Sequence, residues 1–557
     1  MLNYSNEQLT EWYEFKSHTW PLIFLLFICF WSFFYNSGVI EVDYMEARNL
    51  VTAREILENN NWLVPTMNGE IRIAKPPLPT WFAALASLSV GGTDNLSLLR
   101  IPNALASLLL IFFAYGLCWT LSRDRNLAFM SAAILATNFL MMRVGHRASW
   151  DIFCHTFMLG ALWAFAAGLR ENRGWPVFAA MGTLMGLSFM SKGPVSFYVL
   201  LLPFIVSYFW IFGIHELKTK WPLLALAILI CAFISSLWPL YISSFHPEAF
   251  LATVQQESQA WGNKHVRSFS YYLNFPLYSG LWLVVTIAVL IKPFAEKRIK
   301  AVQNYRFLLL WLVLVILLLS IVPEKKLRYL MPAMIPLALL GGTLIRGVMI
   351  GFRQGKPGKG NLRVIAFHAF LVSIVGVIYP CALFYQLYAT GQAATPLFTI
   401  LVLSIFLAIV VNSWIFFKRR NVFGLFYLTA IQFCVIAFLY MDLYRDVSFS
   451  NKEYKIMTQN DSAALPPETS IFLLEDRLGI QYVWDLRRQI KQWNIEEVRQ
   501  LLASGETIAV ISGGDPYEAM AETIDGNVDI QVIGRFDYNK DKTQKIKTVL
   551  SRIRLKN

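Results

Sequence analysis

Carboxylates stand beside long apolar segments at two places in this sequence. Asp43 and Glu46 precede an amphipathic stretch, and Asp151 opens a long apolar run. Ionisable groups near bilayer depth are costly to place, so they are functional candidates. A carboxylate at such a site is suited to orienting or deprotonating an acceptor group. The structural alternatives are acidic residues that complement a helix dipole at the first place and a helix cap at the second.

Cations form a second set, also at the ends of apolar segments. A phosphate at the membrane surface is the ligand that such cations suit. There are two structural alternatives. Lys75 could extend its ammonium to the membrane interface at the start of a helix. Glu324 and lipid headgroups could pair with Lys326 and Arg328. The candidates are Arg48, Arg72, Lys75, Lys192, Lys326 and Arg328, with Tyr329 beside the last of them.

Separated carboxylates together with several cations fit one reaction in particular. In it an acceptor displaces a lipid phosphate from a sugar carbon, and the cations stabilise the charge that develops on the phosphate. The sequence has no nucleotide-binding glycine loop, so a nucleotide sugar is not the expected donor. A divalent metal is left open, because His265 and the nearby carboxylates lack a ligand spacing.

The elements that must position these residues are membrane-spanning helices. The chain has 557 residues, of which 56% are hydrophobic and only 15% charged. Its net charge of +13 lies in short clusters between apolar segments, which is typical of membrane protein loops and argues against nucleic acid. A span needs about 20 apolar residues. Thirteen segments are predicted to span: 20–38, 99–121, 127–145, 150–169, 175–191, 194–213, 221–243, 271–291, 306–322, 329–347, 363–388, 396–417 and 422–441.

One shorter apolar stretch, 76–91, decides the orientation of everything after it. If this stretch does not cross, six basic clusters fall on the same side, as the positive-inside rule requires. We therefore expect an interfacial helix at 76–91, a cytoplasmic N-terminus and a long outer loop at 39–98. The six clusters are Arg123/Arg125, Arg170/Arg173, Lys218/Lys220, 292–306, 346–363 and 418–420.

The tail from residue 443 to 557 changes character. It is polar, and short apolar runs at 471–474 and 508–511 alternate with helix-like stretches such as 494–503. This pattern predicts one small α/β domain on the outer side. The expected division is therefore a transmembrane domain at 1–442 and a soluble domain at 443–557.

Several strings resemble the bacterial GT-C glycosyltransferases, relatives of the protein O-mannosyltransferases and of the aminoarabinose lipid A transferase. The resemblance extends from about residue 37 to 345. Met45 and Ala74 depart from it, since the family commonly has Asp and Glu there. The matching strings are Glu46–Asn49, Ala53–Leu57, Asn61–Thr66, Asn68-Gly69, Lys75–Leu78, Arg147 with Asp151, Ser191–Pro194, Trp238-Pro239, and Arg328-Tyr329 with Pro332.

The resemblance implies a GT-C fold: a polytopic α-helical membrane protein with a small C-terminal extracytoplasmic α/β domain. It implies an inverting transfer from a polyprenyl (undecaprenyl) phosphate sugar to lipid A or another envelope glycan or lipid, at the outer face of the bacterial inner membrane. The tail would then be periplasmic. Asp43 or Glu46, with Asp151, would be catalytic, and Arg48, Lys75, Lys192, Arg328 and Tyr329 would hold the donor phosphate.

Other functions share part of this pattern. A protein O-glycosyltransferase would differ only in its acceptor. A transporter or flippase of lipid-linked sugars would share the apolar bulk and the anionic ligand, but transporters tend to show internal repeats, and none stands out here. A structural scaffold would explain the tail but not the outward cations.

Overall fold

The computed structural model describes residues 19–89, 92, 95–215, 217–263, 265–299, 302–355, 358–474, 479–520, 528–540 and 547–556. The expected cytoplasmic N-terminus lies outside these residues. The chain divides into two compact units. One comprises 1–38, 73–382 and 395–442, and the other comprises 39–72, 383–394 and 443–557. Each unit is described by itself.

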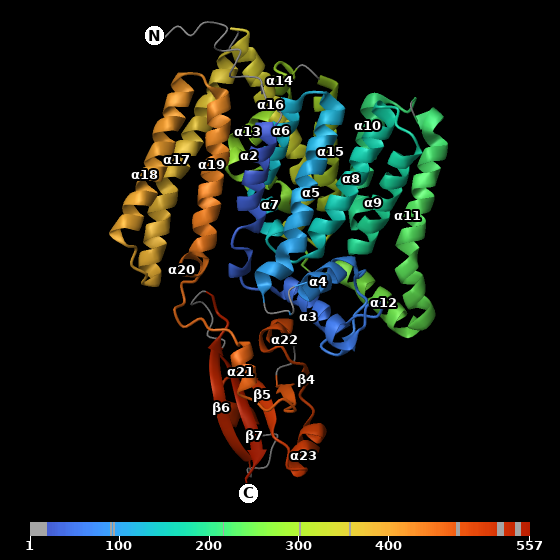
Figure 1. Cartoon of the computed structure of the whole chain (residues 1–557), viewed down its shortest axis with the longest axis vertical. Helices are drawn as coiled ribbons and strands as arrows, with labels where there is room; N and C mark the ends of the chain where they lie inside the picture. The colour runs from blue at the N-terminus through green and yellow to red at the C-terminus, as the bar shows by residue number, and fades with distance from the viewer. Residues whose placement is uncertain are drawn as a thin grey trace. The chain divides into compact units, whose positions relative to one another are not determined.

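The first unit is a bundle of helices (Figure 1). Its helices are α2 (Thr19–Cys29), η1 (Phe30–Phe34), α4 (Leu78–Ser89), α5 (Leu96–Ser122), α6 (Arg125–Ala136), α7 (Phe139–Gly145), α8 (Trp150–Arg170), α9 (Trp175–Lys192), η3 (Phe197–Leu201), α10 (Leu202–Phe212), α11 (Leu217–Phe245), α12 (Pro247–Asn263), η4 (Phe269–Tyr272), η5 (Phe275–Trp282), α13 (Leu283–Leu290), α14 (Lys292–Glu296), α15 (Val302–Ile321), η6 (Leu327–Leu330), α16 (Met331–Arg353), α17 (Lys359–Thr390), α18 (Pro396–Lys418) and α19 (Val422–Asp442).

Ten helical segments of the described chain are long and apolar enough to cross a membrane, and the bent pair α6–α7 brings the number to eleven. The thirteen predicted spans all appear as helices, but two do not meet this standard. Helix α9 ends in serine and lysine and is less apolar. The segment 194–213 is divided between η3 and α10. Helix α4 has 12 residues, fewer than the roughly 20 that a span needs.

Glycines at the helix crossings leave room for aromatic side chains at the centre of this unit. Helix α8 packs against both α5 and α9. A Cβ at Gly160 of α8 would lie 2.6 Å from the ring of Phe113, and a Cβ at Gly116 of α5 would lie 2.6 Å from Trp163. Small residues at such crossings let helices approach closely in a membrane. Outer helices instead expose large apolar side chains, such as Leu229 on α11 and Leu397 on α18, as lipid-facing helices do.

The second unit contains a five-stranded sheet in the order β4-β3-β5-β7-β6 (Figure 1). Strand β3 is parallel to β4 and β5, while β7 is antiparallel to β5 and β6. The predicted strands at 471–474 and 508–511 and the predicted helix at 494–503 correspond to β3, β5 and α23. The elements are α20 (Tyr444–Ser448), α21 (Gln459–Ala463), β3 (Ile471–Leu473), α22 (Ile480–Leu486), β4 (Ile490–Gln492), α23 (Ile495–Ala503), β5 (Ile508–Gly513), α24 (Pro516–Met520), β6 (Val528–Asp537) and β7 (Lys547–Leu555).

The first half of the long loop belongs to this second unit. It forms α3 (Tyr44–Asn59) and a hairpin of β1 (Thr66–Met67) and β2 (Glu70–Ile71). Asn68 and Gly69 turn the hairpin with φ of 58° and 83°, the positive values that a tight hairpin turn requires. Residues 73 onward group with the helical bundle. The loop 39–98, expected as a single feature of the transmembrane domain, is therefore divided between the units.

Side-chain hydrogen bonds fix this hairpin to the rest of its unit. The buried Glu55 of α3 accepts from the Thr66 hydroxyl and from the amides of Asn68 and Gly69. The Asn68 side chain donates to the carbonyl of Ile490 at 2.7 Å and accepts from the Ile490 amide at 2.8 Å. Ile490 begins β4, an edge strand of the sheet.

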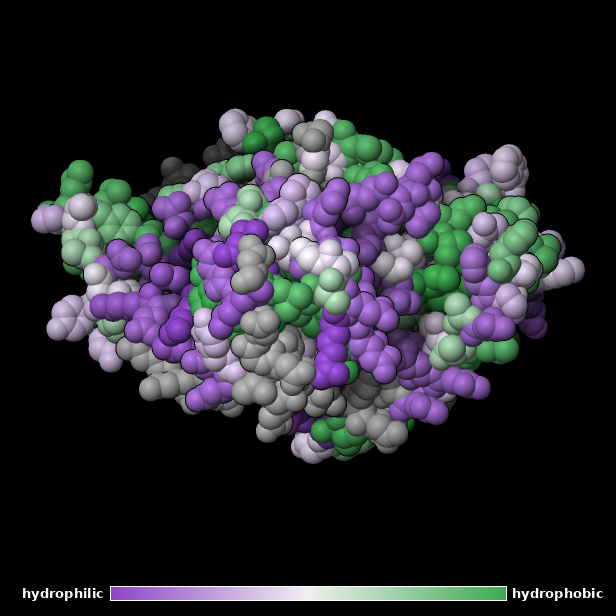
Figure 2. Space-filling model, turned by 90° about the horizontal axis from the view of Figure 1, so that it is seen from below, coloured by the Kyte–Doolittle hydropathy of each residue, from purple (hydrophilic) through white to green (hydrophobic). Residues whose placement is uncertain are grey.

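Hydrophilic residues dominate the face seen in Figure 2, as expected for a surface in contact with water.

Candidate active site

Two helix ends of the bundle form the centre of the candidate site. Asp151 lies in the first turn of α8, and Lys192 is the last residue of α9. A carboxylate at a helix N-terminus and a cation at a helix C-terminus are both favoured by the helix dipoles. Gly193, with φ of 69°, ends α9 at this point. The packing of α8 on α9 thus brings the Lys192 ammonium into an ion pair with Asp151 Oδ1, and both side chains are buried.

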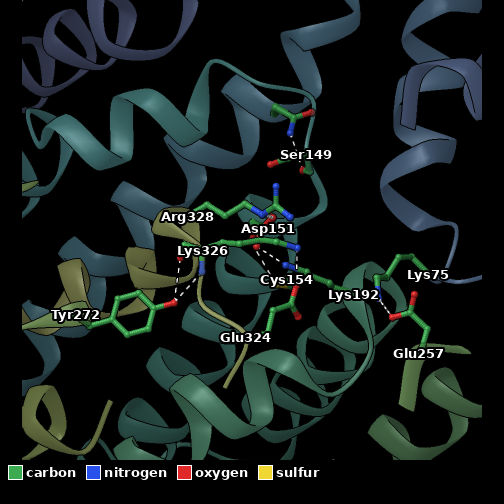
Figure 3. A network of polar contacts seen from close by, with 11 residues as sticks. Lys75, Ser149, Asp151, Cys154, Lys192, Glu257, Tyr272, Glu324, Lys326 and Arg328 are labelled. Atoms are coloured by element: carbon green, nitrogen blue, oxygen red, sulfur yellow. Dashed lines mark hydrogen bonds and ion pairs between the residues drawn. The ribbon is translucent and has the colours of Figure 1, made fainter. Parts of the chain in front are cut away.

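A short turn before α16 supplies the remaining cations. Arg328 Nε lies 3.4 Å from Asp151 Oδ2, so both carboxylate oxygens face a cation (Figure 3). The Tyr329 ring lies 4.9 Å from the Lys192 ammonium and 5.5 Å from the Arg328 guanidinium. Cations at this range over an aromatic face are stabilised by the ring quadrupole. Asp151, Lys192, Arg328 and Tyr329 therefore form one connected cluster.

Lys326 is placed at the edge of this cluster by its own backbone. The Tyr272 hydroxyl donates to the Lys326 carbonyl at 3.0 Å and accepts from the Lys326 amide at 3.1 Å. The Lys326 ammonium pairs with Glu324 at 2.5 Å and lies 5.8 Å from the Tyr329 ring. The neighbouring Lys325 points inward instead. It donates to the Val322 carbonyl, and burial lowers the pKa of its ammonium.

Lys75 contacts a different part of the chain. Its ammonium lies 2.8 Å from Glu257 Oε2 on α12, and Figure 3 draws this pair in the same view as Asp151 and Arg328. The segment after α12 is fixed by its backbone. Val266 forms an antiparallel bridge with Glu324, and the Lys325 amide donates to the His265 carbonyl.

The other predicted site residues lie in the second unit. Asp43 is the N-cap of α3, where its carboxylate accepts from the amides of Met45 and Glu46, each at 2.9 Å. Glu46 is fully buried in the first turn. Asp43 therefore lies just before the first residue of the helix, whereas Glu46 lies within it.

Two further predicted cations also lie in this unit. The Arg48 guanidinium lies 5.6 Å from the centre of the Tyr44 ring, one turn earlier on α3. Arg72 is 8% exposed and follows β2, where its amide donates to the Pro65 carbonyl. A role for either residue in binding a phosphate stays a prediction.

Metal ligation has little support in the described part of the chain. No group of three or more His, Cys, Asp or Glu side chains among these residues could hold a metal ion.

Sequence reasoning found most of the cluster but missed two residues that contact its cations or their main chain. Glu257 and Tyr272 contact Lys75 and Lys326 from 182 and 54 residues away along the chain. No local spacing signals contacts of this kind. One sign was the concentration of polar residues between α11 and η4.

Comparison with known proteins shows sequence similarity over part of this chain. Residues 74–238 match the family model described as dolichyl-phosphate-mannose-protein mannosyltransferase. The chain is 29% identical over 354 residues to undecaprenyl phosphate-alpha-4-amino-4-deoxy-L-arabinose arabinosyl transferase 1 of Pseudomonas fluorescens, covering 61% of this chain and 60% of that protein. It is 26% identical over 364 residues to the undecaprenyl phosphate-alpha-4-amino-4-deoxy-L-arabinose arabinosyl transferase of Pectobacterium carotovorum, and the alignment covers 63% of each chain. The alignments thus span somewhat less than two thirds of these curated relatives.

Solved structures show the same architecture. ArnT from Cupriavidus metallidurans bound to undecaprenyl phosphate superposes with a TM-score of 0.71 at 15% identity, over 96% of this chain and 98% of that one. The apo state of the same protein gives a TM-score of 0.70. At this level of identity the likeness establishes the fold.

The chain is a multi-pass membrane protein with a GT-C type fold, made of a helical bundle and a small sheet unit. Its cationic cluster lies at the ends of the bundle helices rather than within them. Over part of its length, the chain is similar in sequence to the undecaprenyl phosphate-alpha-4-amino-4-deoxy-L-arabinose arabinosyl transferases.

Proposed function

We propose that this protein is an inverting glycosyltransferase that uses a polyprenyl-phosphate sugar as donor and an envelope lipid or glycan, such as lipid A, as acceptor. The observation that carries this proposal is the cluster of Lys192, Arg328 and Tyr329 around Asp151. Such a cluster is suited to a phosphate that leaves with its lipid. The relatives from Pseudomonas and Pectobacterium support it, because they are named as undecaprenyl phosphate-dependent arabinosyl transferases.

The charge change in this reaction explains why several cations are needed. In the donor the phosphate is a diester with one negative charge. When the acceptor oxygen bonds to the sugar carbon, the bond from that carbon to the phosphate oxygen breaks, and a monoester with about 1.5 to 2 charges is released. Cations fixed beside the leaving oxygens stabilise the transition state more than the bound donor, which is what lowers the barrier.

The acceptor determines how much base catalysis is required. A hydroxyl acceptor must pass its proton to a carboxylate, whereas a lipid A phosphate is already ionised and needs mainly to be oriented. Asp43, Glu46 and Asp151 are the proposed carboxylates for this step.

We place the reaction at the outer face of a bacterial inner membrane, with the N-terminus in the cytoplasm and residues 443–557 in the periplasm. The basic clusters support this orientation, because they fall on one side of the membrane when α4 does not cross it. Transfer to a protein hydroxyl is the second candidate. The family model that matches residues 74–238 favours it, since its description is a protein mannosyltransferase.

Turnover of a labelled donor by the purified full-length protein tests this function. We expect sugar transfer from a radiolabelled polyprenyl-phosphate sugar to lipid A, and Arg328→Met should lower kcat by about 10²- to 10³-fold because one phosphate-stabilising group is lost.

Arg346→Met is the matched control. Arg346 lies on α16, the helix that begins just after Arg328, about 20 Å from the start of that helix, and pairs with Asp124. Its loss should change kcat by less than a few fold. Wild-type protein that turns over no polyprenyl-phosphate sugar, or an Arg328→Met variant as active as the control, would refute the proposal. Transfer to a peptide hydroxyl but not to lipid A would favour the second candidate.

A further inference from the structure

Three carboxylates neutralise the cations of the candidate site, and they differ in how firmly they are held. Asp151 is 4% exposed and faces two cations. Glu324 is 17% exposed and is two residues from its partner Lys326. Glu257 is 38% exposed and reaches its partner Lys75 from a separate helix. Glu257 is therefore the counter-ion that is most easily displaced.

The helix that carries Glu257 is itself weakly packed. None of the described side chains from Pro247 to Gln259 on α12 is buried, and Leu251 and Val254 are both exposed. Few buried contacts are typical of an element that moves at low cost. Lys75, in contrast, is followed by Pro76 and Pro77, whose rings restrict the backbone before α4.

Backbone contacts connect α12 to the other side of the cationic cluster. The strand-like bridge of Val266 with Glu324 joins the end of the α12 segment to the turn that carries Lys326 and Arg328. Residues 247–267 thus contact Lys75 through a side chain at one point and the cationic turn through the main chain at another. A ligand that binds Lys75 as well as the cations of the turn would have to displace Glu257 from Lys75. It could leave the backbone bridge between Val266 and Glu324 intact.

We propose that Glu257 is the counter-ion that the donor phosphate replaces on Lys75. This inference rests on the proposed function and names one determinant of donor affinity. The Glu257 carboxylate competes with the phosphate for one ammonium, so it weakens binding of both the donor and the released polyprenyl phosphate. The competition favours release of the doubly charged product, which would otherwise be held more tightly than the donor.

Equilibrium binding of undecaprenyl phosphate to the full-length protein in lipid nanodiscs tests this directly. Glu257→Gln should lower the Kd by about two- to fivefold at low ionic strength, equivalent to about 0.4 to 1 kcal/mol, because the competing charge is removed. The difference should shrink at high salt, since partly exposed pairs are screened. Glu257→Ala provides a second variant if the glutamine protein does not fold.

Glu248→Gln is the matched control. Glu248 is exposed on the first turn of the same helix, so this variant removes the same charge at a different place. Its Kd should equal that of the wild type. If Glu257→Gln binds no more tightly than Glu248→Gln while wild-type binding and turnover are normal, the inference is wrong and the proposed function stands. If the wild type binds no undecaprenyl phosphate, both are wrong.

Discussion

At the scale of single residues, Asp151 is held between two cations. Its two oxygens face Lys192 and Arg328, so the carboxylate is better suited to anchoring these cations than to receiving a proton. Removing one partner of a buried ion pair leaves an uncompensated charge, which is strongly destabilising. The positions of both cations therefore depend on Asp151, whatever further role it has toward the acceptor.

The first-loop carboxylates can be tested without disturbing the helix that they begin. Asn is as good an N-cap as Asp, so Asp43→Asn keeps the two backbone hydrogen bonds and removes only the charge. If these carboxylates act on the acceptor, a protein carrying both Asp43→Asn and Glu46→Gln should lose about 10²-fold or more in kcat toward a hydroxyl acceptor. The measurement is donor turnover at saturating substrates.

The control for this double variant is its thermal unfolding temperature, which should be close to that of the wild type. A loss of turnover that matches a loss of folded protein would argue for a structural role only. Retained transfer by the folded double variant would contradict a catalytic role for the first loop.

Residue types and chain positions predicted the cationic cluster well, and for a physical reason. Asp151, Lys192 and Arg328 all stand at the ends of helices, and helix ends in a bundle can be located from the apolar pattern. The pairing partner of Lys75 could not be predicted in the same way. Glu257 reaches Lys75 only because α12 folds back after α11, and no local pattern encodes that return.

At the scale of elements, the hairpin of the first loop is held by an edge strand of the sheet. The side-chain amide of Asn68 forms hydrogen bonds with both the backbone carbonyl and the backbone N–H of Ile490, as a neighbouring strand would. The adjacent Arg54 of α3 donates to the carbonyl of Val483 on α22. The helix that carries Asp43 and Glu46 is thus positioned by the tail, although the two are far apart in the sequence.

Asn68→Gly should weaken the contact with Ile490 while keeping the turn. Glycine tolerates a positive φ but lacks the side-chain amide that bonds to Ile490. We expect faster hydrogen exchange at the Ile490 amide by about tenfold, the effect of losing a hydrogen bond worth about 1 kcal/mol or slightly more. Hydrogen exchange with mass spectrometry on the full-length protein measures it.

Asn60→Gly is the matched control for this prediction. Asn60 also has a positive φ, of 56°, as the C-cap of α3, and its side chain accepts from Trp62 rather than from the sheet. Exchange at Ile490 should be unchanged in this variant. Equal exchange rates in the Asn68 and Asn60 variants would contradict the role given to Asn68.

The apolar pattern predicted where helices lie more reliably than which of them span. Long runs such as 396–417 are unambiguous, because length and composition agree. The segment 194–213 is long enough in sequence, but Phe197–Leu201 within it form the π-helix η3, which leaves α10 only 11 residues. A change of helix type of this kind depends on tertiary packing, which apolar composition does not encode.

At the scale of the whole molecule, orientation follows from whether α4 crosses the membrane. Its 12 residues are too few, so the first-loop hairpin and the tail are expected on the outer side. A membrane-impermeant maleimide should therefore label Glu70→Cys in intact spheroplasts, because residue 70 is exposed in its unit.

Arg419→Cys, which is exposed at the C-cap of α18, should be labelled only after the membrane is permeabilised. The background protein carries Cys381→Ser, since Cys381 is the exposed cysteine among the described residues. Labelling of residue 70 only after permeabilisation would overturn the orientation.

The contact between Asn68 and Ile490 also constrains how the protein is made. These residues are 422 positions apart, so at about 5 to 20 residues per second the ribosome needs roughly 20 to 80 s to supply the partner of the hairpin. During that interval the nascent hairpin has no strand to pair with. The five-stranded sheet of the second unit can be completed only after β7 has been translated, so this unit closes late in synthesis although its first residues emerge early.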